Sequence, residues 1–319
     1  MPTITYTADG FPTALGPTLV GTQTLGVSWA EIIWAAISVG RGSLRHLTQY
    51  GVFSVFEITY RAALIYANLR EGPSGTLSRS SAYDGLDPSE KGAISYFLGM
   101  TLAKLFSHRL LSVPWLMHLD VYRQQLQLIL LGKSKPDFVG LNATHDWIVL
   151  EAKGRTNEYE ESVLQSAKIQ TQQLTTIQGI QPVLRVGSLA YFSAGNLQFA
   201  MRDPKGDSGR EKIKDLPLTK DALLRAYYHP FQVWLREATE VQTIVINGRG
   251  YRMVALQEFD LSIGLSNEVA EQLSVVKPTK EQHASKDNEF IGADGVLVRL
   301  GSIWSPEKMR LEPQARYRS

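Results

Sequence analysis

Cysteine is absent from this chain of 319 residues. The chain therefore forms no disulfide, has no thiol nucleophile and offers no cysteine-ligated zinc site, a composition that fits a reducing compartment. An excess of one charge is also missing, because 33 Lys and Arg residues face 31 Asp and Glu residues and leave a net charge of +2. Any attraction of nucleic acid must therefore come from a local patch of basic residues and not from the overall charge of the protein.

Basic residues are missing from the first 40 positions, so the positively charged start of a secretory signal is not present there. The apolar stretch at residues 25–40 is too short for a membrane span and contains Glu31. We therefore expect a cytoplasmic protein without a membrane partner. The phosphate-binding pattern Gly-x-x-x-x-Gly-Lys-Ser/Thr and the esterase pattern Gly-x-Ser-x-Gly are missing as well, which argues against both of those enzyme classes.

Two short apolar runs flank a polar turn in the middle of the chain. Residues 138–141 and 147–150 are typical of buried strands, and residues 142–146 have the length of a hairpin turn. Folding about Thr144 places Asp137 opposite Glu151, and directly opposed residues have Cβ atoms about 4.5–5.5 Å apart. Lys153 lies two residues after Glu151 and therefore shares its face of the strand.

Two carboxylates at this separation repel each other, so one gains a proton unless a cation neutralises the pair. A hard divalent ion such as Mg²⁺ binds one or two carboxylates and keeps waters and a substrate phosphate as its other ligands. Lys153 can hold a phosphate oxygen or the attacking water. Asp137, Glu151 and Lys153 thus provide the groups that metal-assisted phosphodiester hydrolysis requires.

The same residues carry a family resemblance. Asp137 after a proline, followed by Glu151-x-Lys153 at the end of a hydrophobic strand, resembles the PD-(D/E)xK (restriction-endonuclease-like) nuclease superfamily. The resemblance implies that Asp137 and Glu151 bind Mg²⁺ or Mn²⁺, with the Ala152 backbone carbonyl as a further ligand. It implies that Lys153 assists the water and stabilises the developing charge, and that the products carry a 5′-phosphate and a 3′-hydroxyl.

By family habit the substrate is expected to be DNA, although nothing in the sequence itself selects DNA over RNA. Restriction, repair or phage defence is the setting that this analogy suggests, and a regulatory or targeting protein partner would restrain the nuclease. The resemblance covers residues 87–195. There we expect a helix at 87–107, strands at 115–121, 125–131, 138–141 and 147–150, a helix at 160–177 and a strand at 183–192.

This order predicts an α/β (α+β) fold with a restriction-endonuclease-like core, a mixed central sheet flanked by helices, in residues 86–200. Residues 1–85 are expected to form a helical N-terminal region after an irregular or extended lead-in over residues 1–26. Residues 201–319 are expected to form an α+β extension. It should contain a helix at 219–240 that is bent or broken near Pro230, and hairpins that turn at Asn247-Gly248 and at residues 293–295.

Four further residues are candidates for the site, each with a structural alternative. Glu90 could complete the metal site from the first core helix, but it also occupies the capping-box position after Asp87, which we favour. Gln165 and Lys168 could reach the site or the nucleic-acid backbone, or could belong to a solvated helix face. Arg155 could bind a phosphate or be an ordinary surface arginine.

Two other interpretations of the whole chain stay open. The chain could be a catalytically silent nuclease-fold subunit that binds nucleic acid or serves in assembly. Alternatively, the hairpin could be a structural ion-pair site in an unrelated fold, which a separation between Asp137 and Glu151 of more than about 8 Å would favour.

Overall fold

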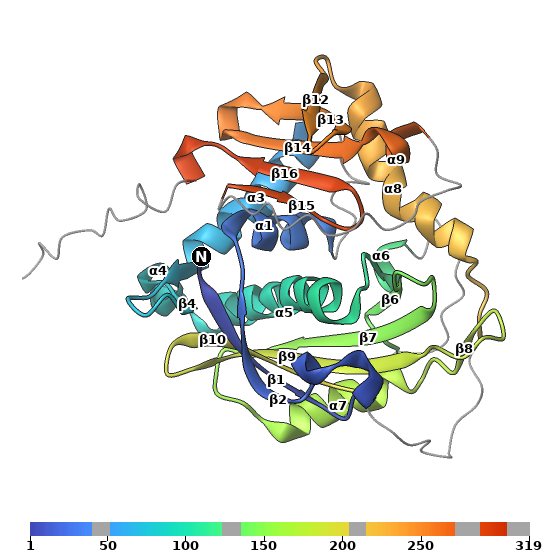
Figure 1. Ribbon diagram of the computed structural model, residues 1–319. Coiled ribbons are helices and arrows are strands. Elements are labelled where there is room, and N and C mark those ends of the chain that lie inside the picture. The colour runs from blue at the N-terminus through green and yellow to red at the C-terminus, as the bar shows by residue number, and fades with distance from the viewer. Residues whose placement is uncertain (40–51, 123–134, 204–214, 272–287, 305–319) are drawn as a thin grey trace, which may run out of the picture.

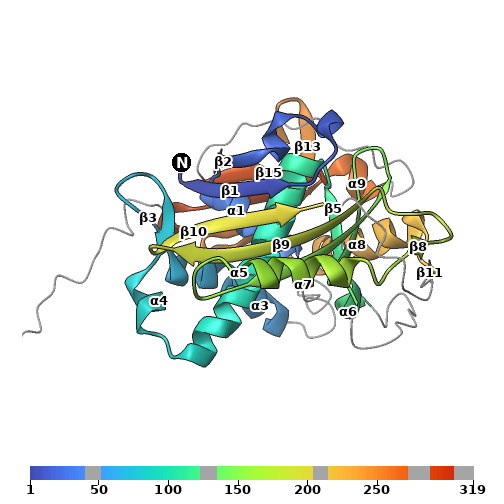
Figure 2. The same cartoon turned by 90° about the horizontal axis from the view of Figure 1, so that it is seen from below.

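Two β-sheets enclose a layer of helices in the computed structural model, which describes residues 1–39, 52–122, 135–203, 215–271 and 288–304 (Figure 1). The helices between the sheets are α1 (Trp29–Ser38), α3 (Val52–Asn68) and α5 (Pro88–Leu111). Helix α7 (Glu161–Thr171) covers the other face of the larger sheet, as Figure 2 shows from below. The expected mixed α/β class is therefore confirmed. No helix of the described ranges is long and apolar enough to cross a membrane.

The larger sheet has nine strands among the described residues and follows the order β2-β1-β10-β9-β7-β6-β5, with β3 and β4 attached beside β10. It is mixed, because β7 runs parallel to β9 and β1 runs parallel to β10, whereas the other neighbours are antiparallel. Its strands are β1 (Thr3–Asp9), β2 (Gly21–Gly26), β3 (Leu69–Glu71), β4 (Leu77–Arg79), β5 (Trp115–His118), β6 (Phe138–Leu141), β7 (Trp147–Gly154), β9 (Leu184–Ser193) and β10 (Asn196–Arg202).

The elements predicted for the described part of residues 87–195 are present in the predicted order, with different boundaries. Strand β5 ends at His118 instead of residue 121, because the short helix α6 (Leu119–Tyr122) begins there. Helix α7 ends at Thr171 instead of residue 177, and the short strand β8 (Thr176–Ile177) follows and pairs with β11 (Asp215–Leu216). The strand predicted at 125–131 lies outside the described residues.

The first 26 residues, expected to be an irregular or extended lead-in, include two extended strands that belong to the central sheet. Ile4, Tyr6 and Ala8 alternate with less buried residues along β1, which is the pattern of a strand that covers a core. Strand β1 pairs with β10, far away in the sequence, and β2 pairs with β1. Between these strands lie the short 3₁₀ helices η1 (Thr13–Leu15) and η2 (Pro17–Leu19), and α4 (Ser81–Gly85) precedes α5.

The second sheet lies in the C-terminal part of the chain. Its order is β12-β13-β14-β16-β15. The predicted turn at Asn247-Gly248 joins β12 to β13, with both residues at positive φ. The elements are β12 (Gln242–Ile246), β13 (Arg249–Leu256), β14 (Leu261–Ser266), β15 (Glu289–Ile291), β16 (Val296–Leu300), α8 (Lys220–Glu237), α9 (Asn267–Glu271), η3 (Gln257–Phe259) and η5 (Ser302–Trp304). Of the two outcomes expected near Pro230, a bend or a break, the break is absent, because α8 continues through this residue.

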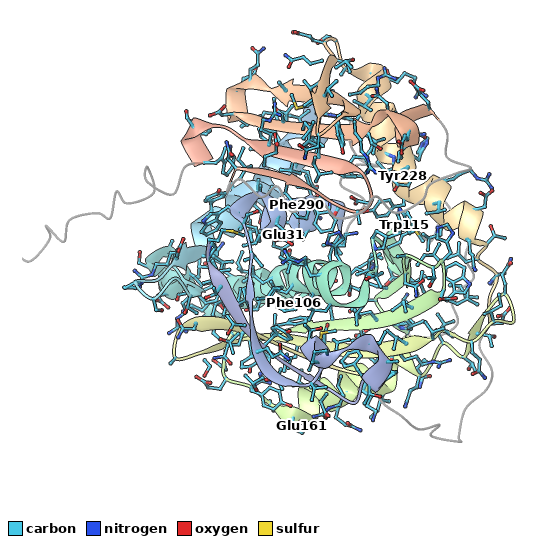
Figure 3. The ribbon with its side chains drawn as sticks, viewed as in Figure 1. Glu31, Phe106, Trp115, Glu161, Tyr228 and Phe290 are labelled. Atoms are coloured by element: carbon cyan, nitrogen blue, oxygen red, sulfur yellow. The ribbon has the colours of Figure 1, made fainter. Side chains whose placement is uncertain are left out.

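A buried polar network joins the second sheet to the helices and to β5. Asp294, in the turn between β15 and β16, accepts a hydrogen bond from Tyr227 Oη at 2.6 Å through its carboxylate, and one from Tyr228 Oη at 2.7 Å through its carbonyl. Trp115 Nε1 donates to Tyr228 Oη at 2.6 Å (Figure 3), and Lys104 Nζ donates to Tyr227 Oη at 3.0 Å. Complete burial lowers the pKa of Lys104 to about 8. One hydrophobic core continues across these contacts.

Candidate functional site

The hairpin of β6 and β7 has the predicted register. Phe138 pairs with Leu150 and Leu141 pairs with Trp147, so the strands fold back about Thr144. Asn142 holds the turn, because its Oδ1 accepts hydrogen bonds from the backbone N–H of Thr144 at 3.0 Å and of Asp146 at 2.7 Å. This short-range asparagine turn explains why the register could be read from local sequence alone.

Asp137 and Glu151 meet at the end of this hairpin. The backbone N–H of Asp137 donates to Glu151 Oε2 at 2.8 Å, and the backbone N–H of Ala152 donates to Asp137 Oδ2 at 3.1 Å. Lys153 Nζ donates to Glu151 Oε1 at 2.5 Å. The structure thus brings the two carboxylates and the lysine together, as the sequence predicts.

The electrostatics of Glu151 are unusual for a carboxylate. Only 1% of the residue is exposed, whereas Asp137 is half-buried. Burial, and then the nearby Asp137 carboxylate, raise the pKa of Glu151 to about 7, against the opposing effect of the Lys153 ammonium. The Lys153 ammonium alone does not offset the cost of ionising Glu151 in a buried site beside Asp137. The two carboxylates therefore favour one more positive charge nearby, either a proton or a cation.

The donor set fits a hard divalent ion. Two carboxylates lie together, and the Ala152 N–H bonds to Asp137. Because the N–H and C=O of one strand residue point to the same side, the Ala152 carbonyl is expected on the side of β7 that faces β6 and Asp137. Within the described ranges, no group of three or more His, Asp or Glu side chains could hold a metal. A Mg²⁺ ion here would therefore complete its coordination with waters and substrate oxygens, as Mg²⁺ commonly does.

Strand β7 is held closely between α5 and α7, which fixes the position of the site. A Cβ at Gly154 would lie 1.8 Å from the backbone oxygen of Ser95 on α5. On the other face, a Cβ at Gly187 of β9 would lie 2.8 Å from the backbone nitrogen of Lys168 on α7. Since Glu151 pairs directly with Gly187, α7 crosses the sheet beside the carboxylate. Only glycine allows the two helices to approach this closely.

The two candidate residues on α7 lie in different surroundings. Gln165 is exposed, on a helix that buries Leu164 and Ala167, so it lies on the solvated side. Lys168 is half-buried, and its backbone contacts the sheet next to the strand position that pairs with Glu151. Helix α7 therefore carries both residues on the face of the sheet toward Glu151, but Gln165 points to solvent and the charge of Lys168 acts on Glu161 and Asp203.

Glu90 does not join the carboxylate pair, so its candidacy as a metal ligand is not supported. Its Oε2 accepts a hydrogen bond from the backbone N–H of Asp87 at 3.2 Å, and Asp87 Oδ1 accepts from the backbone N–H of Ser89 and of Glu90. These bonds form a complete capping box at the exposed start of α5. The side chain turns back to satisfy the helix terminus instead of turning inward.

Arg155 is paired with an acidic neighbour. Its guanidinium forms an ion pair with Glu160, so a phosphate would have to displace that carboxylate. Ser188 was not identified from the sequence, although its hydroxyl donates to the Glu151 carbonyl at 3.0 Å and it is fully buried. No local signal could have found it, because the pairing of β7 with β9 is not local.

Comparisons with protein-family models, with curated proteins and with solved structures found no match to this chain. The functional argument therefore depends on the residues of the hairpin and their surroundings.

Proposed function

We propose that this protein is a Mg²⁺-dependent nuclease that hydrolyses phosphodiester bonds of nucleic acid, with DNA as the expected substrate. The observation that carries the proposal is the direct opposition of Asp137 and buried Glu151 at a strand end, with Lys153 bonded to Glu151. The element order around the hairpin, which resembles that of PD-(D/E)xK nucleases, supports the same proposal.

The residues have separate roles in this proposal. Asp137 and Glu151 hold the metal, with the Ala152 carbonyl beside them, and the metal supplies Lewis-acid activation of the phosphodiester and of water. The Lys153 side chain is 29% exposed, so a substrate can reach its ammonium. The ammonium can then give up its bond to Glu151 and bind a phosphate oxygen as negative charge develops on the phosphate. Glu151 must be ionised to act as a ligand, so metal binding displaces its proton.

A catalytically silent subunit is the second candidate, and one observation favours it. Both oxygens of Glu151 already accept hydrogen bonds, one from the Asp137 N–H and one from Lys153. The hairpin is therefore satisfied as an ion-pair site without a metal. In this case the chain would bind nucleic acid or serve in assembly without cleaving.

Cleavage assays with near-isosteric variants separate the two candidates. The full chain is incubated with plasmid DNA, single-stranded DNA and RNA in Mg²⁺, in Mn²⁺ or in EDTA. We expect metal-dependent cleavage that Asp137→Asn, Glu151→Gln and Lys153→Met each reduce by roughly 100-fold or more, because each removes a group that acts on the transition state. The matched control is Glu268→Gln, an exposed carboxylate on α9, which should leave cleavage unchanged.

Two results would count against the nuclease. Cleavage that persists at full rate in Asp137→Asn would assign the activity to a contaminant or to another site. If no substrate is cleaved, calorimetry with Mn²⁺ decides between the remaining interpretations. Mn²⁺ binding that is lost in Asp137→Asn would support a metal site that does not cleave the substrates tested. If the wild type binds no Mn²⁺, the interpretation as a structural ion pair is supported instead.

A further inference from the structure

The end strands of the two main sheets differ in how they meet solvent. In the larger sheet, β5 is buried and packs against α8, and β2 is a polar strand that begins and ends with glycine. In the smaller sheet, β15 is only three residues long, and its Glu289 is paired with Arg299. Burial, short length and charge keep a sheet edge from pairing with another chain, and glycine weakens a strand. Strand β12 has none of these features.

Strand β12 is an exposed edge with a strong tendency to pair. It contains no charged residue and no proline, and four of its five residues are β-branched. Val245 is 72% exposed, because its neighbour on β13 is Gly250, which has no side chain to cover it. Among the described residues β12 pairs with β13 alone, and its other edge lies at the top of the molecule in Figure 1. Such an edge is a template for another strand.

The turn to β13 shows which backbone groups of β12 are open. Asn247 and Gly248 form a two-residue turn, so Ile246 and Arg249 close it as a hydrogen-bonded pair. Bonded and non-bonded pairs alternate along an antiparallel ladder. The pairs that Thr243 and Val245 form with β13 are therefore non-bonded, and the N–H and C=O groups of these two residues point away from β13.

A second copy of the same strand fits these open groups. In an antiparallel pair centred on Ile244, Thr243 of each copy lies opposite Val245 of the other copy. The open groups then bond to each other in about four backbone hydrogen bonds. Thr243 of one copy covers the exposed Val245 of the other, and the two Ile244 side chains lie against each other. The strand is therefore complementary to itself.

The charges at the two ends of β12 favour the antiparallel arrangement. Glu240 is exposed and lies two residues before the strand, whereas Arg249 follows the turn at its other end. Antiparallel pairing brings the negative end of one copy to the positive end of the other, and parallel pairing would bring like charges together. A two-fold axis uses each β12 edge once, and β15 at the opposite edge is short and charged. The assembly therefore closes at two copies.

We propose that the protein forms a two-fold symmetric dimer in which β12 of one copy pairs antiparallel with β12 of a second copy. The two smaller sheets then become one continuous sheet. The contact is limited to a short strand and its flanks, so we expect a weak dimer whose population depends on protein concentration. This proposal does not depend on the nuclease proposal, and its test does not measure cleavage.

Single cysteine variants test the register, because the chain has no cysteine of its own. Ile244→Cys places two thiols at the two-fold axis, where non-bonded partners have Cα atoms about 4.5 Å apart, within reach of a disulfide. Ile246→Cys is the matched control on the same face of β12. Its partner in the other copy is Gln242, so its two thiols lie about 13 Å or more apart. Under mild oxidation of the full chain, we expect Ile244→Cys to form disulfide-linked dimers at least ~10-fold faster than Ile246→Cys.

Sedimentation of the chain without cysteine tests the dimer without a cross-link. The wild type should show a dimer fraction that rises with concentration. Val245→Lys should raise the dissociation constant at least ~10-fold, because the two lysines would lie about 7–8 Å apart across the two-fold axis. Val245 is exposed, so this change leaves the core of each copy intact. The matched control is Val20→Lys, at a valine that is 61% exposed beside β2, and it should leave the dissociation constant unchanged.

Three results would overturn the proposal. The first is a wild type that sediments as a monomer at every concentration tested. The second is an equal rate of disulfide formation in Ile244→Cys and Ile246→Cys. The third is a dimer that persists in Val245→Lys, and its loss in Val20→Lys instead would assign the contact to the edge at β2.

Discussion

Replacing Glu151 by glutamine should change how stability depends on pH. The pKa of Glu151 is about 7 in the folded protein, compared with an ordinary value of 4.5. The folded state therefore binds the proton more tightly than the unfolded state. The resulting stabilisation is fully present below about pH 4.5 and is lost as the pH rises through 7. Between pH 5 and pH 8, linkage gives a loss of about 2–3 kcal/mol from this residue alone.

The measurement compares the wild type with Glu151→Gln by urea unfolding at pH 5 and pH 8 in metal-free buffer. Because the other titrating groups are shared, subtracting the two pH dependences leaves the contribution of Glu151 together with its coupling to Asp137 and Lys153. We expect the variant to gain about 2–3 kcal/mol relative to the wild type on going from pH 5 to pH 8. A relative stability that changes by less than about 0.5 kcal/mol would refute the conclusion that burial and Asp137 penalise this carboxylate.

Mg²⁺ adds a second part to the same experiment. An ion that binds only the folded state stabilises it by about 2.7 kcal/mol when present at 100 times its dissociation constant. At pH 8 we expect Mg²⁺ to stabilise the wild type but not Glu151→Gln. Equal stabilisation of both proteins would place the Mg²⁺ elsewhere.

Three further predictions concern the framework of the site. Gly154→Ala should destabilise the fold by about 3 kcal/mol or more in urea unfolding, because the new Cβ would meet the α5 backbone, whereas Gly26→Ala, with open space around it, should stay within about 0.5 kcal/mol. Glu90→Gln should leave cleavage unchanged, since glutamine also completes a capping box, and a loss of activity would make Glu90 a ligand after all. Lys104→Met should cost about 3 kcal/mol or more at pH 7 by thermal unfolding, and Asp294→Asn in addition should recover part of the loss, because the uncompensated buried charge is then removed.

Local sequence was sufficient for the hairpin and its three residues. The apolar runs on either side of Thr144 fix the register, and the register fixes which side chains oppose each other. The same reasoning identified the capping box of Glu90 and the turn at Asn247. In each case the residues that bond to each other lie within 15 positions of each other, where spacing has a direct geometric meaning.

Distant pairings could not be predicted in this way. Strand β1 shows the alternation of Ile4, Tyr6 and Ala8, but nothing near it indicates that its partner is β10. The contacts around Glu151 could not be predicted for the same reason. Its bond with Ser188 and the close approach of α7 at Gly187 depend on the pairing of β7 with β9. The end of α7 also differs from its predicted position, because the local pattern locates a helix better than it locates the ends of that helix.

The pairing of β1 with β10 also has a consequence for synthesis in the cell. Thr5 of β1 pairs with Gln198 of β10, which is made about 190 residues later, so β1 cannot pair with β10 until then. At roughly 5–20 residues per second, the ribosome needs on the order of 10–40 s to supply it. Until then β1 and β2 can form only a two-stranded hairpin, which is marginal in water. The nascent chain therefore exposes an unpaired strand edge until β10 has been made, and chaperone binding to residues 3–26 is expected to matter most during this interval.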